Sequence, residues 1–167
     1  MGNSSSRIPG EGISKKELER MHRRFQRLSN GTERVGLAAF QTVPELAGNP
    51  FVPRIFQLFD VNKDGNISWQ EFTAGVEYLG KLSTDEEKSM FAFQLYDLDA
   101  NGFVSANELF QMLKLLMGRA LSDAQLDQIV RSTVAEHDED GDGQLSPSEF
   151  SKLLSASDLE HKLAINF

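Results

Sequence analysis

The sequence of 167 residues contains no cysteine and no long apolar run. Without cysteine, the chain has no disulfides, no thiolate zinc site and no cysteine nucleophile. No run approaches the ~18 apolar residues of a membrane-spanning helix, and no secretory hydrophobic segment opens the chain. The three histidines, His22, His137 and His161, are scattered and have neither triad nor zinc-ligand spacing. The lack of cysteine suits a cytosolic protein, so we expect a cytoplasmic location.

The sequence also has few basic residues, 17 against 25 acidic ones, which gives a net charge of -8. Segments 60–71, 97–108 and 138–149 contain eleven acids and one base, Lys63, a net charge of -10 that leaves the rest of the chain at +2. The acidity is therefore concentrated where a hard divalent cation could bind. An acidic chain of this kind is a poor nucleic-acid binder, so we expect no such partner.

These three segments repeat one twelve-residue pattern, with an oxygen-bearing side chain at positions 1, 3 and 5, glycine at 6, serine at 9 and glutamate at 12. In a calcium loop, side chains at 1, 3 and 5 and the carbonyl at 7 supply oxygens, position 9 commonly acts through a water, and glutamate at 12 binds with two oxygens. The predicted ligands are Asp60, Asn62, Asp64, Asn66, Ser68 and Glu71; Asp97, Asp99, Asn101, Phe103, Ser105 and Glu108; and Asp138, Asp140, Asp142, Gln144, Ser146 and Glu149.

Each loop also carries a helix-starting signal, because its serine and glutamate form an S-x-x-E capping box. A single loop could be a polar turn that caps a helix without a metal, but three matching copies predict three calcium sites. The bidentate glutamate favours Ca²⁺ over Mg²⁺. Loop 138–149 has four carboxylates at liganding positions and the others three. Charge count makes loop 138–149 the tightest site, although rigidity can reverse that order.

Apolar residues at helical spacing flank every loop, and position 8 is apolar in each, which suits a short strand that pairs loops two by two. Helix-loop-helix units of this kind, called EF-hands, bury the apolar faces of their helices against each other in pairs. Three such hands therefore imply a fourth. Residues 25–28 resemble its entering helix and Val35 its apolar position, but Arg34 lies near the usual glycine, no glutamate ends the loop, and Phe40 follows one residue too soon. We interpret it as a structural hand that does not bind calcium.

The predicted fold is all-α, with two lobes of paired EF-hands, four helix-loop-helix units in all, and short two-stranded β pairings between loops. The expected division is a flexible N-terminal segment (1–14), an N-terminal lobe (15–80), a linker (81–87), a C-terminal lobe (88–155) and a C-terminal tail (156–167).

The chain begins with Met-Gly followed by Ser6, which matches the signal for N-myristoylation of Gly2. A flexible serine-rich terminus is the alternative. One myristoyl chain holds a membrane only marginally. Basic residues of the N-terminal region offer a second membrane signal or simply a solvated helix face: Arg7, Lys15, Lys16, Arg20, Arg23, Arg24 and Arg27.

The chain resembles the calcineurin B family, the EF-hand regulatory subunits of the calcium-dependent Ser/Thr protein phosphatase. The resemblance lies in segments 43–46 (Val-Pro-Glu-Leu), 49–50, 91–97 (ending Tyr-Asp), 108–111 continuing to Gly118, 126–130 and 158–162, together with the myristoylation signal. It departs from the family in its degenerate first loop, and in Arg119 and Ala120, which stand where the family usually has a polar amide pair of the composite drug–immunophilin surface.

The resemblance implies a regulatory subunit that is not itself an enzyme. Calcium-bound hands would open an apolar groove for one amphipathic helix of the phosphatase catalytic subunit. Segment 110–117 is apolar on more than one face, so one face can serve the core and another a partner, unless a compact lobe buries all of it. The alternatives are a calcium sensor of a kinase or a membrane ion exchanger, as in related calcineurin-B-like proteins, and a calcium buffer with little opening.

Overall fold

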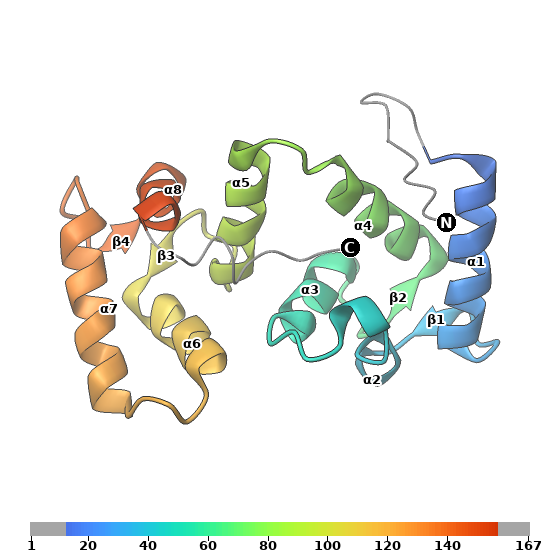
Figure 1. Cartoon of the computed structure of the whole chain (residues 1–167), viewed down its shortest axis with the longest axis horizontal. Helices are drawn as coiled ribbons and strands as arrows, with labels where there is room; N and C mark the ends of the chain where they lie inside the picture. Colours follow the sequence, from blue (N-terminus) through green and yellow to red (C-terminus); the bar gives the residue numbers. More distant parts are fainter. Residues whose placement is uncertain (1–12, 157–167) are drawn as a thin grey trace, which may run out of the picture. The chain divides into compact units, whose positions relative to one another are not determined.

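The structure is a computed structural model that describes residues 13–156, and its architecture is the expected helical one (Figure 1). The helices are α1 (Lys15–Ser29), α2 (Leu37–Phe40), α3 (Val52–Phe59), α4 (Trp69–Lys81), α5 (Asp85–Tyr96), α6 (Ala106–Met117), α7 (Asp123–His137) and α8 (Pro147–Ala156), with a 3-10 turn, η1, at Pro44–Leu46. The strands are β1 (Arg34–Val35), β2 (Ile67–Ser68), β3 (Val104–Ser105) and β4 (Gln144–Leu145). No helix of the described part is long and apolar enough to span a bilayer.

The strands pair the loops two by two, as predicted. β1 lies antiparallel to β2 with Val35 opposite Ile67, and β3 lies antiparallel to β4 with Val104 opposite Leu145. All four of these apolar side chains are fully buried. The fourth hand is therefore present, and Val35 occupies its apolar loop position.

Two compact units share the described residues, one within Met1–Val43 and Phe56–Lys81, the other within Pro44–Ile55 and Leu82–Phe167. Residues 44–55 thus group with the second unit, whereas the sequence places them in the N-terminal lobe. α4 continues through Lys81, and α5 begins at Asp85. α5 begins with a capping box, in which the Thr84 side chain accepts the N–H of Glu87 and the Glu87 side chain accepts the N–H of Thr84.

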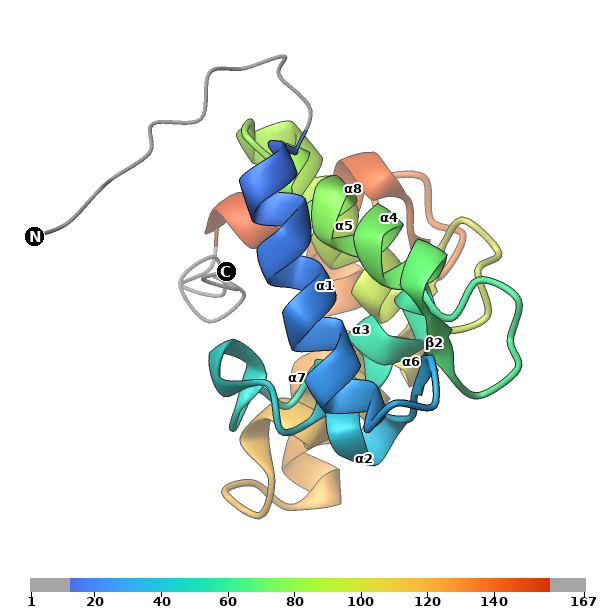
Figure 2. The ribbon, with the colours of Figure 1, turned by 90° about the vertical axis from the view of Figure 1, so that its right-hand side faces the viewer.

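The first unit is held together by aromatic contacts between its hands. Figure 2 shows α1 in front, with α4 and β2 beside it. The Phe25 ring lies 5.4 Å from that of Phe72, and the Phe40 ring lies 5.6 Å from that of Phe59. Gly75 permits a close approach of α4, since a Cβ there would lie 2.5 Å from the Phe59 ring. This packing fixes both ends of loop 60–71.

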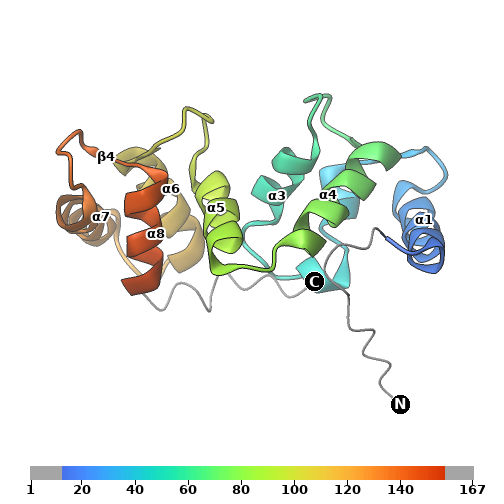
Figure 3. The same ribbon diagram turned by 90° about the horizontal axis from the view of Figure 1, so that it is seen from above.

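The second unit contains two complete hands, with α5, α6, α7 and α8 grouped together (Figure 3). Tyr96 lies at its centre, with ring centroids 5.0 Å from Phe150 and 6.1 Å from Phe51. Phe51 explains why residues 44–55 belong here, because it is fully buried against this cluster.

The first hand has a very short exiting helix. α2 has four residues, and its N-cap, Gly36, makes no side-chain hydrogen bond. Pro44 follows soon after, and the residue before a proline disfavours helical backbone. The chain therefore leaves the helix and turns through η1.

Candidate metal centres

Backbone N–H groups orient the first carboxylate of each loop. In loop 138–149, Asp138 Oδ1 accepts hydrogen bonds from the N–H groups of Gly141 and Asp142, and its Oδ2 accepts one from Gly143 at 2.8 Å. The glycine N–H at position 6 makes the same bond to Asp60 at 2.8 Å and to Asp97 at 2.9 Å. The tight turn at the glycine, which has positive φ in all three loops, makes this contact.

The glutamate at position 12 closes each loop onto its own start. Glu149 Oε1 accepts from the N–H of Glu139 at 2.8 Å, while its Oε2 accepts from the N–H and the hydroxyl of Ser146 at 2.7 and 2.8 Å. These bonds, led by those from Ser146, lower the pKa of Glu149 to about 2. Glu71 and Glu108 have the same arrangement. Burial raises the pKa of both, but the serine and loop N–H bonds outweigh it and lower each pKa.

Carboxylate oxygens converge in two of the loops. One atom from each of Asp97, Asp99 and Glu108 lies within 4.8 Å of the others, and the same holds for Asp138, Asp140 and Glu149. The hydrogen bond from the Asp142 N–H lowers the pKa of Asp140, but desolvation and repulsion by Asp142 and Glu149 together outweigh that bond, so the pKa is raised. Converging carboxylates that repel each other fit a hard divalent cation, whose charge would relieve that repulsion.

Loop 60–71 has Asn62 at position 3. Its three carboxylates at liganding positions are therefore those of Asp60, Asp64 and Glu71. Among the described residues, Asp60, Asp64 and Glu71 do not form a converging group of the kind found in the other loops. The oxygens of Asp60, Asn62 and Asp64 still accept loop N–H bonds as their counterparts do.

The remaining predicted ligands lie in the loops with other partners. The side-chain oxygens at position 5, Asn101 and Asp142, accept the N–H of Phe103 and Gln144 at 2.8 Å. The serine hydroxyls at position 9 donate to the glutamate and accept its N–H, so Ser68, Ser105 and Ser146 are caps in this structure. Their roles as ligands stay predictions, as do those of the position-7 carbonyls of Asn66, Phe103 and Gln144.

Two arginines near the loops were not predicted from the sequence. Arg34 of β1 forms an ion pair with Asp64. Arg54 of α3 donates to the carbonyls of Gln94, Leu95 and Asp97, at 3.1, 3.2 and 2.5 Å, where α5 ends and loop 97–108 begins. Burial lowers the pKa of Arg54, and the charges of Asp97 and Glu108 oppose that shift. Neither arginine has a local sequence signal, because their partners lie 30 or more residues away.

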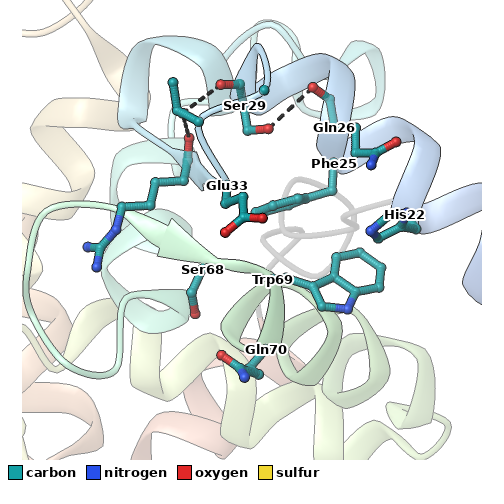
Figure 4. A pocket seen from close by; sticks show the side chains of 11 residues that line it. His22, Phe25, Gln26, Ser29, Glu33, Ser68, Trp69 and Gln70 are labelled. Carbon is teal, nitrogen blue, oxygen red and sulfur yellow. Dashed lines mark hydrogen bonds between the residues drawn. The ribbon is translucent and has the colours of Figure 1, made fainter.

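A cavity of about 520 Å³ lies in the first unit beside the end of loop 60–71. Figure 4 shows His22, Phe25 and Trp69 around it, with Glu33, Ser68 and Gln70 also on its wall. The Trp69 ring lies 4.9 Å from that of His22 and 5.4 Å from that of Phe25. Trp69, the single tryptophan of the chain, therefore joins loop 60–71 to helix α1.

Comparisons with known proteins agree with these loops. A family described as an EF-hand domain pair matches residues 86–155, and one described as an EF hand domain matches residues 52–77. The calcineurin B protein of Naegleria gruberi is 42% identical over 157 residues, which cover 93% of this chain and 89% of that protein. The type 1 calcineurin B protein of Dictyostelium discoideum is 39% identical over 100% of this chain and 99% of its own length.

The human type 2 calcineurin B protein is 37% identical over 169 aligned residues, 99% of each chain. This similarity extends over both units and all four hands, and it confirms the resemblance found in the sequence. The chain belongs to the calcineurin B family of EF-hand, calcium-binding regulatory subunits, which are not themselves catalytic.

Proposed function

We propose that this protein binds three Ca²⁺ ions and, in that state, holds and activates the catalytic subunit of a calcium-dependent Ser/Thr protein phosphatase. The observation that carries the proposal is full-length similarity to calcineurin B proteins, combined with three loops that keep every predicted side-chain oxygen. The loops would hold the ions through the eighteen ligands named above.

Helix α6 offers an apolar surface for the partner helix. Met112 and Leu113 are buried in the second unit, while Leu115 is 46% exposed and Phe110 and Met117 are half-buried. The unit therefore does not bury all of segment 110–117. An amphipathic helix of the catalytic subunit would cover this face.

The partner can be tested by calcium-dependent capture. We expect the protein to retain a purified phosphatase catalytic subunit with calcium and to release it when calcium is chelated. Leu115→Glu should weaken capture at least tenfold, whereas Ile129→Glu, at a 42% exposed apolar residue of α7, should not. Retention of a kinase or an ion-exchanger segment instead of the phosphatase would contradict the proposal, and no calcium-dependent capture at all would indicate a buffer.

Calorimetric titration with calcium should give three sites. A fourth site would show that the first hand, residues 15–40, binds calcium after all. Glu71→Gln, Glu108→Gln and Glu149→Gln should each remove one site, because each glutamate is proposed to bind the ion with two oxygens.

We also propose a cytoplasmic protein that contacts membranes through a myristoyl group on Gly2, a residue outside the described part of the chain. The mass of the intact protein, co-expressed with a myristoyl transferase, should increase by one myristoyl group, and Gly2→Ala should abolish the increase. The lobe boundaries given above and the loss of the drug–immunophilin surface at Arg119 and Ala120 likewise stay predictions.

A further inference from the structure

The ion pair between Arg34 and Asp64 joins the degenerate loop to the neighbouring calcium loop. Arg34 Nη1 contacts Asp64 Oδ2 across 30 residues of sequence. The β1–β2 register brings the two loops together, since Arg34 lies directly opposite Ser68, position 9 of loop 60–71. The register places the guanidinium within reach of the neighbouring loop.

Asp64 is one of only three carboxylates at liganding positions in this loop. Its Oδ1 accepts the N–H of Asn66 at 2.9 Å, and its Oδ2 accepts from Asn62 Nδ2 as well as from Arg34. The side chain is 32% exposed, so it lies at the rim of the loop. One of the three negative charges that would attract calcium is therefore already paired with a positive charge of the protein.

The other two loops differ on this point. Loop 138–149 has four such carboxylates, and the nearby ion pair of Lys152 with Glu139 involves a residue at position 2 that is not a predicted ligand. In loop 97–108 the hydrogen bonds described for Arg54 run to backbone carbonyls, while its charge also acts on Asp97 and Glu108. Among the described ion pairs, Arg34–Asp64 alone involves a predicted calcium ligand.

We propose that Arg34 is a built-in competitor of calcium at loop 60–71, a cation supplied by the degenerate hand that must leave Asp64, or share it, when the ion binds. Loop 60–71 is then the weakest of the three sites and responds last as calcium rises. The inference rests on the proposed binding of calcium by this loop. It also gives the first hand a role, because its loop supplies a guanidinium to its partner in place of a site of its own.

The expected effect follows from Coulomb's law. The positive charge of an arginine next to a ligand carboxylate repels Ca²⁺. At high dielectric this repulsion corresponds to about a tenfold increase in the dissociation constant for calcium. Loss of the charge in Arg34→Gln should thus lower the half-saturating calcium concentration of loop 60–71 about tenfold. The side chain of Arg34 is 58% exposed, so the fold should tolerate the change.

Trp69 makes the test specific to this loop. It occupies position 10 of loop 60–71 and contacts His22 and Phe25 of α1, so its fluorescence reports on this site and not on the two sites of the second unit. The full chain is titrated with calcium at low salt and again at ~1 M salt, where charges are screened within about 3 Å. Calorimetry in parallel counts the sites.

Arg131→Gln is the matched control, because Arg131 forms an exposed arginine–aspartate pair with Asp127 on α7 and neither residue is a predicted calcium ligand. We expect a tenfold shift of the Trp69 midpoint for Arg34→Gln, less than twofold for Arg131→Gln, and a smaller shift at high salt. Arg34→Lys, which keeps the charge, should retain most of the wild-type midpoint.

Two results would overturn the proposal: a midpoint for Arg34→Gln no lower than for the control, which would make the pair an ordinary surface contact, or a higher midpoint, which would mean that Arg34 organises the loop for calcium. If Trp69 gives no calcium signal in either protein and calorimetry finds only two sites, loop 60–71 is not a calcium site. That outcome rejects the third site itself and leaves the other two intact.

Discussion

At the scale of single residues, hydrogen bonds within each loop hold the carboxylates of its proposed calcium ligands in place. The position-1 aspartate and the position-12 glutamate take loop N–H bonds that fix their oxygens, and the serine at position 9 holds the glutamate from the other side. Calcium binding then needs less reordering of side chains, which lowers its entropic cost. The same bonds start the helix that follows each loop, so one glutamate serves both the site and the fold.

The side-chain hydroxyl of Tyr96 is an energetically unfavourable group in the core of the second unit. Its hydroxyl is buried and has no hydrogen-bond partner among the described residues. Burial raises its pKa to about 12. Because an unpaired buried hydroxyl costs about 1–3 kcal/mol, Tyr96→Phe should raise the free energy of unfolding by about 1 kcal/mol, as measured by urea denaturation. A loss of stability would show that the hydroxyl has a partner after all.

Glu87 should make the protein's stability depend on acid pH. Hydrogen bonds from Thr84 and Ser83 lower its pKa to about 2 from 4.5. Because the folded-state pKa is depressed, this contribution is complete above pH ~4.5 and is lost as pH falls towards about 2. The difference in urea midpoint between wild type and Glu87→Gln, measured in chelator, should therefore shrink across this range. A difference that does not change with pH would contradict the shift.

At the scale of elements, Arg54 joins the start of α3 to the end of α5 within the second unit. It lies on α3, which leads into loop 60–71, and it satisfies carbonyls at the end of α5, which leads into loop 97–108. The last carbonyls of a helix lack hydrogen-bond donors within the helix. Here one half-buried guanidinium supplies the missing donors.

Arg54→Met keeps the apolar stem of this side chain but loses the hydrogen bonds to the carbonyls of Gln94, Leu95 and Asp97. We expect the second unit to lose about 2 kcal/mol of unfolding free energy, because bonds to charged groups are worth about 1.5–3 kcal/mol each and water replaces part of them. Arg54→Lys should recover only a minor part, since an ammonium cannot span several carbonyls as the planar guanidinium does. Chemical denaturation followed by ellipticity measures both, and full recovery by lysine would contradict this account.

The elements that the sequence predicts well are those whose signals are local. Ser105 and Glu108 are three residues apart, and their capping box and loop lie where predicted. Pro147 begins α8, as its preference for the first helical position indicates. The interactions that the sequence does not predict are long-range. In the sequence, Arg34 is only an arginine near the usual glycine position of a degenerate loop. Its ion pair with Asp64, which the local sequence does not indicate, depends on the pairing of β1 with β2.

At the scale of the whole molecule, the charge distribution ties stability to calcium. The three loops contain eleven acidic residues and one lysine, in a chain of net charge -8. The calcium-free protein therefore carries strong electrostatic repulsion within its loops. Binding relieves that repulsion in proportion to the number of sites in each unit: one in the first and two in the second under the proposed function. Calcium should therefore stabilise the two units unequally.

At calcium about 100-fold above the dissociation constant, each site adds about 2.7 kcal/mol, which amounts to about 5 kcal/mol for the second unit and half of that for the first. Trp69 fluorescence follows the first unit, and far-ultraviolet ellipticity follows the helices of both. We expect calcium to separate the two melting curves, with the ellipticity retaining a later transition. Glu149→Gln should remove about half of the gain of the second unit and leave the Trp69 transition unchanged. If both probes instead shift together by equal amounts, the two units unfold as one and the unequal distribution of sites has no energetic consequence.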